Sequence, residues 1–210
     1  MSWRGAALLA LLALVGVAAG FGASWLAAAN PSGAGAAAPV AATSPSLPVD
    51  PVPEILPDPT TPALAEGLPL VDQSVGSGAF RMTLPVPKGW DFFENSLNEW
   101  QWRPPDQPDF GYVLRVEQVL SNRRSIDWTL DRRIDELRED ESNVEVLGQT
   151  ADSLHFSYVT ANHLRHGYLR WKDLTGSDNA QVEIAVTGRE VDDAGMAELI
   201  ARVGAGIRLG

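Results

Sequence analysis

The hydrophobic and polar positions divide the chain into three segments. Residues 6–29 carry no charge, residues 30–78 show no regular period, and residues 79–210 alternate between apolar and polar positions. This pattern predicts an N-terminal transmembrane anchor at residues 1–29, a disordered linker at 30–78 and one globular domain at 79–210.

The apolar segment is long enough to cross a membrane as a single helix. Its 24 residues rise by about 1.5 Å each and span about 36 Å, whereas a hydrocarbon core is about 30 Å thick. Arg4 precedes the segment and no Lys or Arg follows until Arg81. The positive-inside rule therefore places the N-terminus in the cytoplasm and the domain outside the cell membrane. Gly16 and Gly20 form a G-x-x-x-G pair, which either packs two such helices together or reflects a composition rich in Ala and Gly.

A cleaved secretory signal is the alternative to an anchor. Ala27, Ala28 and Ala29 form a small-residue cleavage site, and cleavage there would release a secreted protein. We favour the anchor because the apolar region of a signal is only about 7 to 15 residues long.

The linker has ten prolines and neither an aromatic nor a basic residue, so it lacks the side chains of a core. We interpret it as an extended spacer. Two alternatives remain open: a docking site for a proline-binding partner, or a glycosylated stalk at Thr43, Ser44, Thr60 and Thr61.

Alternating positions in the globular domain predict strands with one buried face. Pro85 and Pro87 are expected to end the first strand, because proline cannot donate to a sheet. A short turn at residues 161–163 joins two strands and puts Leu154, Phe156 and Trp171 on the core face. The predicted strands are residues 80–84, 90–95, 99–103, 112–120, 143–149, 153–160, 164–172 and 180–188.

Two amphipathic helices complete the domain. One runs from Ser125 or Asp127 to about Asp140, and we interpret its charged faces as solvated. The other begins after Asp192. Strands with one polar face and two helices predict an α+β fold, in which an antiparallel sheet packs against the helices. The apolar stripes are Leu130, Ile134 and Leu137 on the first helix, and Met196, Leu199, Ile200, Val203 and Ile207 on the second.

The charge balance and the absence of cysteine narrow the classes of function. A net charge of −11 disfavours binding to nucleic acid or to anionic lipid headgroups. Without cysteine, thiol catalysis, thiolate metal sites and lipidation of an N-terminal cysteine are excluded. No Gly-rich nucleotide loop and no G-x-S-x-G motif occurs, and we predict no cofactor.

Histidines are the remaining candidates for chemistry, and two of the three share the polar face of the predicted hairpin. His155 and His166 lie near enough to bind one ligand, but the sequence places no third group beside them, so we predict no metal site. Ser157 lies on the same face. With His155 or His166 it would form a minimal hydrolase site, for which no orienting acid and no oxyanion hole are visible.

Tryptophans form a second set of candidates. Trp100 and Trp102 share one face of a strand that ends at Arg103 before two prolines. They either pack in the core or form an aromatic platform for a sugar, peptide or apolar ligand. The tryptophans expected in the core are Trp90, Trp128 and Trp171.

The domain also resembles a known family at its two ends. A short strand followed by Pro85-Val86-Pro87-Lys88-Gly89-Trp90 resembles the opening of PsbP-like domains, and residues 191–209 look like their last helix. With its Ala- and Pro-rich leader, the layout is similar to actinobacterial envelope proteins of the LpqN/LpqT and alanine- and proline-rich secreted antigen type. The resemblance implies an antiparallel sheet sandwiched by helices, a non-enzymatic accessory role and no catalytic residue. The missing lipidation cysteine departs from the lipoproteins and favours a helical anchor.

Our leading hypothesis is a membrane-anchored, non-enzymatic binding or accessory domain of the cell envelope, with a protein or a glycan as its partner. The expected ligand-binding residues are Trp100, Trp102, Arg103, His155 and His166. Two alternatives are a small hydrolase using the face of His155, Ser157 and His166, and a structural or sensory ectodomain that dimerises through Gly16 and Gly20.

Overall fold

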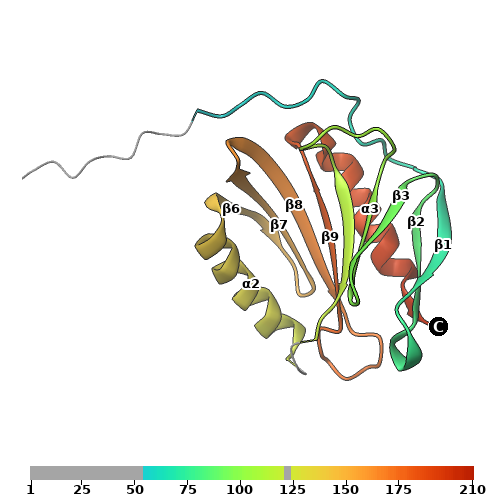
Figure 1. Cartoon of the computed structure of the whole chain (residues 1–210). Helices are drawn as coiled ribbons and strands as arrows, with labels where there is room; N and C mark the ends of the chain where they lie inside the picture. Colours follow the sequence, from blue (N-terminus) through green and yellow to red (C-terminus); the bar gives the residue numbers. More distant parts are fainter. Residues whose placement is uncertain (1–53, 121–123) are drawn as a thin grey trace, which may run out of the picture. The chain divides into compact units, whose positions relative to one another are not determined.

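Two antiparallel sheets and two α-helices make up residues 54–120 and 124–210, the part of the chain that the computed structural model describes (Figure 1). The predicted α+β class is confirmed. No helix within these residues is long and apolar enough to cross a membrane. The predicted anchor, with Gly16 and Gly20, lies outside the described residues.

The larger sheet has seven strands in the order β3-β4-β5-β9-β8-β7-β6, and the smaller has three in the order β1-β2-β10. The strands are β1 Leu70–Val75, β2 Met82–Pro87, β3 Asp91–Ser96, β4 Glu99–Arg103, β5 Val113–Gln118, β6 Ser142–Gln149, β7 Ser153–Thr160, β8 His163–Lys172, β9 Val182–Gly188 and β10 Arg208–Leu209. The helices are α2 Ile126–Asp140 and α3 Asp193–Gly206, with short 3-10 helices η1 Gly78–Phe80 and η2 Glu190–Asp192.

The two faces of the larger sheet are buried by different elements. Helix α3 and strand β2 cover one face over β4, β5 and β9, where the predicted stripe from Met196 to Ile207 is buried. Helix α2 covers the other face over β7 and β8, where Leu130 and Leu137 pack against Phe156 and Trp171 (Figure 1). Alternate residues of one strand therefore enter two separate cores.

The hairpin of β7 and β8 buries Leu154, Phe156 and Trp171 on one face, as predicted, and β8 begins at His163, one residue earlier than predicted. A two-residue turn, Ala161 (φ 47°) and Asn162 (φ 64°), joins the strands, and two positive φ values are typical of the type I′ turn that suits a twisted hairpin. Phe156 lies opposite Gly167, where a Cβ atom would approach its ring to 2.5 Å. The register puts His155 and Ser157 on the face opposite Phe156.

Strand β2 continues through both prolines, so the prediction that Pro85 and Pro87 end it is wrong. All six residues of β2 pair with β1, but only Met82 and Thr83 also pair with β10. Beyond Thr83 the strand is paired on one side alone, and such edge positions tolerate residues without an N–H donor.

The predicted linker is ordered in the part that the structure describes, so the boundary at residue 79 is wrong. Strand β1 lies in this part, and residues 56–68, called the strap below, run across the domain to reach it (Figure 1). The Leu56 amide donates to the Asn162 carbonyl at 2.7 Å, and the Gly67 amide donates to Glu198 at 2.7 Å. Leu64 is only 5% exposed and belongs to the core around α3.

A buried ion pair holds the middle of the strap. Arg189 and Asp192 are 1% and 0% exposed, and their side chains form two hydrogen bonds of 2.8 Å. Arg189 also donates to the carbonyl oxygens of Pro59, Thr61 and Pro62, and Asp192 accepts from the Leu64 amide. Burial alone would raise the pKa of Asp192, but these hydrogen bonds outweigh it and lower that pKa, so the pair is charged at neutral pH.

Candidate functional site

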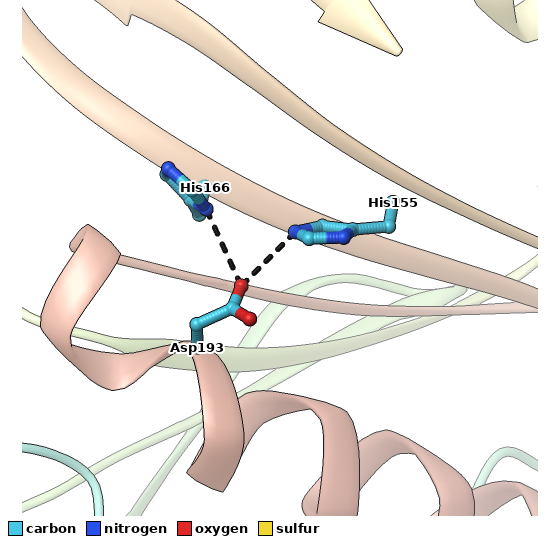
Figure 2. Close-up of side chains that lie close together, drawn as sticks. All are labelled: His155, His166 and Asp193. Carbon is cyan, nitrogen blue, oxygen red and sulfur yellow. Dashed lines mark hydrogen bonds and ion pairs between the residues drawn. The ribbon is translucent and has the colours of Figure 1, made fainter. Parts of the chain in front are cut away.

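His155, His166 and Asp193 meet on the face of the larger sheet that carries α3. His155 comes from β7, His166 from the neighbouring strand β8, and Asp193 from the first turn of α3 (Figure 2). The strand period of two turns both histidines toward α3, and η2 places the start of that helix over them. The two predicted histidines are therefore brought together, and the structure adds a carboxylate.

The three side chains converge on one carboxylate oxygen. Asp193 Oδ1 lies 3.0 Å from Nε2 of His155 and 3.3 Å from Nδ1 of His166 (Figure 2). The contact with His166 is a hydrogen bond. Nε2 of His155 is buried, and its 3.0 Å contact with Asp193 is not a well-aligned hydrogen bond.

Tyr168 supports this cluster from β8. Its hydroxyl donates to Oδ2 of Asp193 at 3.1 Å, and its ring stacks on His155 with centroids 4.0 Å apart and planes 7° apart. Burial, followed by the charge of Asp193, raises the pKa of Tyr168, so the hydroxyl keeps its proton as a donor.

The electrostatics keep His155 uncharged at neutral pH. Burial is the largest effect and lowers its pKa, Asp193 raises it, and the neighbouring His166 lowers it; the net pKa is below the ordinary value for histidine. The neutral imidazole of His155 has one ring nitrogen with a free lone pair.

For the hydrolase interpretation, the structure places an acid, Asp193, beside the histidines but does not place Ser157 in contact with a base. Asp193 would supply the orienting carboxylate that the sequence does not show. Ser157 lies opposite His166 in the sheet, yet it is only 7% exposed, and within residues 54–120 and 124–210 it makes no hydrogen bond to either histidine. A serine without a base in contact is not activated for attack.

Trp100 and Trp102 are part of the core, so the aromatic-platform interpretation is wrong. Each is 1% exposed, and both pack in the core under α3 and β2. The indole N–H of Trp102 donates to Gln73 of β1 at 2.9 Å. The residues of the predicted linker thus cover the rings that would have faced a ligand.

Arg103 lies apart from the histidines. It is exposed at the end of β4, where it donates to Gln101 at 3.1 Å and borders a hollow of about 350 Å³ beside Tyr112 and Tyr158. Arg165, 4% exposed, lies at the same hollow and donates to the carbonyl oxygens of Phe110 and Gly111. Both terminal amino groups of Arg165 are therefore occupied by the loop.

A second hollow lies along helix α2, on the face of the larger sheet opposite the histidines. We call it the α2 groove; its volume is about 470 Å³, within the range of about 300 to 1,000 Å³ typical of ligand sites. Trp128 is 47% exposed here, so its predicted place in the core is wrong. The groove is lined by Arg115, Glu117, Val119, Arg124, Trp128, Thr129, Arg132, Arg133, Glu136 and Glu183.

Arginine outnumbers glutamate in the α2 groove, although the whole chain is acidic. Arg115 is neutralised by Glu117 and Glu183 at 2.7 and 2.5 Å. Arg132 and Arg133 share the single carboxylate of Glu136, at 3.1 and 3.6 Å. Nε of Arg133 is buried without a hydrogen-bond partner among the described residues.

Arg124 and Trp128 form the open end of the groove. The guanidinium of Arg124 lies 4.8 Å from the ring centroid of Trp128, a cation–π distance. Within the described ranges no carboxylate lies in ion-pair distance of Arg124. The groove therefore combines an aromatic face with guanidinium groups that are not fully neutralised.

Sequence reasoning missed Asp193 and the α2 groove for the same reason. Each site joins residues that are distant in the chain, and the pattern along one element does not show them together. One signal was present: Asp193 stands at the start of a predicted helix, where an acidic residue is common for helix stability alone.

No protein-family model matches the chain, and no curated protein matches it. The chain is similar to the solved structure of LpqN, a Mycobacterium tuberculosis protein involved in cell envelope biogenesis, with 13% identity and a TM-score of 0.41. The match covers 66% of this chain and 90% of the LpqN chain. At these values it is a likeness of fold alone, and the PsbP-like family and the membrane anchor stay predictions.

Proposed function

We propose that this protein is a non-enzymatic binding module, held outside the cell membrane, that binds an anionic glycan of the cell envelope in the α2 groove. The observation that carries the proposal is the pairing of exposed Trp128 with Arg124 beside Arg132 and Arg133. An aromatic face suits the apolar face of a sugar ring, and guanidinium groups bind carboxylates in a bidentate fashion.

The charge distribution supports an anionic rather than a neutral ligand. The chain has a net charge of −11, so an anion is repelled by most of the surface. In the α2 groove two arginines share Glu136, and a ligand carboxylate would complete their neutralisation. The predicted anchor supports the location, because Arg4 would keep the N-terminus in the cytoplasm and residues 30–210 would then lie outside the membrane.

Co-sedimentation of the full chain, in detergent, with purified cell walls tests the proposal. We expect the chain to pellet with the walls and to do so less when wall carboxylates are neutralised by amidation. Trp128→Ala and Arg124→Ala should each weaken binding about 10-fold, the effect of losing about 1.4 kcal/mol.

Two matched variants serve as controls. Phe93→Ala removes an aromatic ring that is 46% exposed on β3 and does not line the groove, and Arg138→Ala removes an exposed arginine from the last turn of α2. Both should bind walls like the unaltered chain. Equal binding by groove variants and controls would rule the proposal out.

A further inference from the structure

We propose that His155, His166 and Asp193 bind one divalent transition-metal ion of the zinc class. This site is separate from the α2 groove, because the two histidines lie on the face of the sheet that carries α3 and the groove lies on the other face. The inference therefore does not depend on the proposed glycan ligand.

The spacing of the three ligand atoms suits a tetrahedral ion. Zinc binds imidazole nitrogen and carboxylate oxygen at about 2.0 to 2.1 Å, so two ligands at a tetrahedral angle are about 3.3 to 3.4 Å apart. The two nitrogen–oxygen distances are 3.0 and 3.3 Å, and all three atoms lie within 4.8 Å of one another. Small side-chain rotations would bring the three atoms around one ion.

The environment of the buried Nε2 atom of His155 supports the presence of an ion beside it. Nε2 is buried, and its 3.0 Å contact with Oδ1 of Asp193 is not a well-aligned hydrogen bond, although a buried polar atom without a good partner is costly. An ion between Nε2 of His155 and Oδ1 of Asp193 would satisfy this atom and replace the single hydrogen bond of His166.

A supporting contact of the kind found around metal sites is already present. The Tyr168 hydroxyl donates to Oδ2 of Asp193, which leaves Oδ1 directed at the two histidines. Carboxylate ligands are commonly held in this way by a hydrogen bond to their second oxygen. Tyr168 is therefore a positioning residue and not a ligand.

The donor set and the exposure of the cluster define the kind of ion and site. Two imidazoles and one carboxylate favour zinc and neighbouring ions over Mg²⁺ and Ca²⁺, which prefer oxygen ligands. The Asp193 side chain is 40% exposed, so solvent reaches the ion. Three protein ligands leave one tetrahedral position for water or for a donor from another molecule.

Titration of the full chain in detergent, without a histidine tag and after treatment with chelator, tests the site. Isothermal titration with Zn²⁺ should give one ion per chain, and Mg²⁺ should give no binding. Co²⁺ should produce the strong visible absorption of a four-coordinate ion. His155→Ala, His166→Ala and the near-isosteric Asp193→Asn should each abolish the Co²⁺ spectrum.

Two further variants distinguish binding by the three-residue cluster from nonspecific binding to another histidine. Tyr168→Phe should weaken Zn²⁺ binding by about 10- to 100-fold, as for other groups that orient a ligand. His163→Ala should leave binding unchanged, because His163 stacks on Phe110 at the start of β8 and is not in the cluster. The inference is overturned if Zn²⁺ does not bind, or if His163→Ala weakens binding as much as the correctly folded Asp193→Asn variant.

Discussion

Arg189 and Asp192 show how two residues decide where the folded domain begins. Their side chains are almost completely buried, and between them they bind backbone groups of Pro59, Thr61 and Leu64. Neither residue lies in the strap that it holds. A charged pair next to a helix start is unremarkable in the sequence, so its role appears only when the backbone partners are known.

Replacing Arg189 by alanine is expected to lower the free energy of unfolding by about 3 to 5 kcal/mol, because a buried Asp192 would lose its partner. Urea denaturation of the full chain in detergent measures the change. Arg208→Ala is the control: its pair with Asp72 is 2.6 Å long but 56% and 55% exposed, and such pairs contribute less than about 1 kcal/mol. Losses of equal size in the two variants would contradict the role given to Arg189.

Single residues also show where sequence reasoning stops. That Trp100 and Trp102 share a face follows from the strand period, but whether that face is covered depends on β1 and α3, which are distant in the chain. In the same way, His155 and His166 were placed together by the hairpin register, whereas Asp193 is 27 residues beyond His166. Local pattern placed two of the three residues of the histidine cluster, and the tertiary structure added the third, Asp193.

At the scale of elements, helix and hairpin signals were strong because they are local. Helix α2 begins after Ser125 and ends at Asp140, and β7 has its predicted bounds. The strap has no such signal, since it is held mainly through its backbone carbonyls and amides, and these are the same in every sequence. Its prolines and its lack of aromatic residues are typical of disorder. The strap is nevertheless held in place, because Arg189 and Asp192 of the same domain bind its backbone.

A fragment that begins at residue 79 is therefore expected to be much less stable than one that begins at residue 54. It would lose β1, which pairs with all six residues of β2, and would leave Arg189 and Asp192 without their backbone partners in the strap. Thermal unfolding followed by circular dichroism compares the two fragments. Equal melting temperatures would mean that the strap and β1 contribute nothing to the fold.

At the scale of the whole molecule, the two faces of the larger sheet carry two different candidate binding sites. The α2 groove concentrates guanidinium groups on a protein of net charge −11, and the histidine cluster lies on the other face beside α3. An envelope binding module could thus hold a glycan on one side and a metal ion on the other. The glycan proposal requires that the domain is displayed outside the membrane by residues 6–29, whereas the metal proposal does not depend on this topology.

Cysteine labelling in intact cells tests this topology most directly, because the natural chain contains no cysteine. Ala151→Cys places one thiol in the exposed turn before β7, and Ser2→Cys places one before the apolar segment. With a membrane-impermeant maleimide, we predict that Ala151→Cys is labelled in intact cells and that Ser2→Cys is labelled only after the membrane is opened. Labelling of Ser2→Cys in intact cells, with Ala151→Cys protected, would contradict the account.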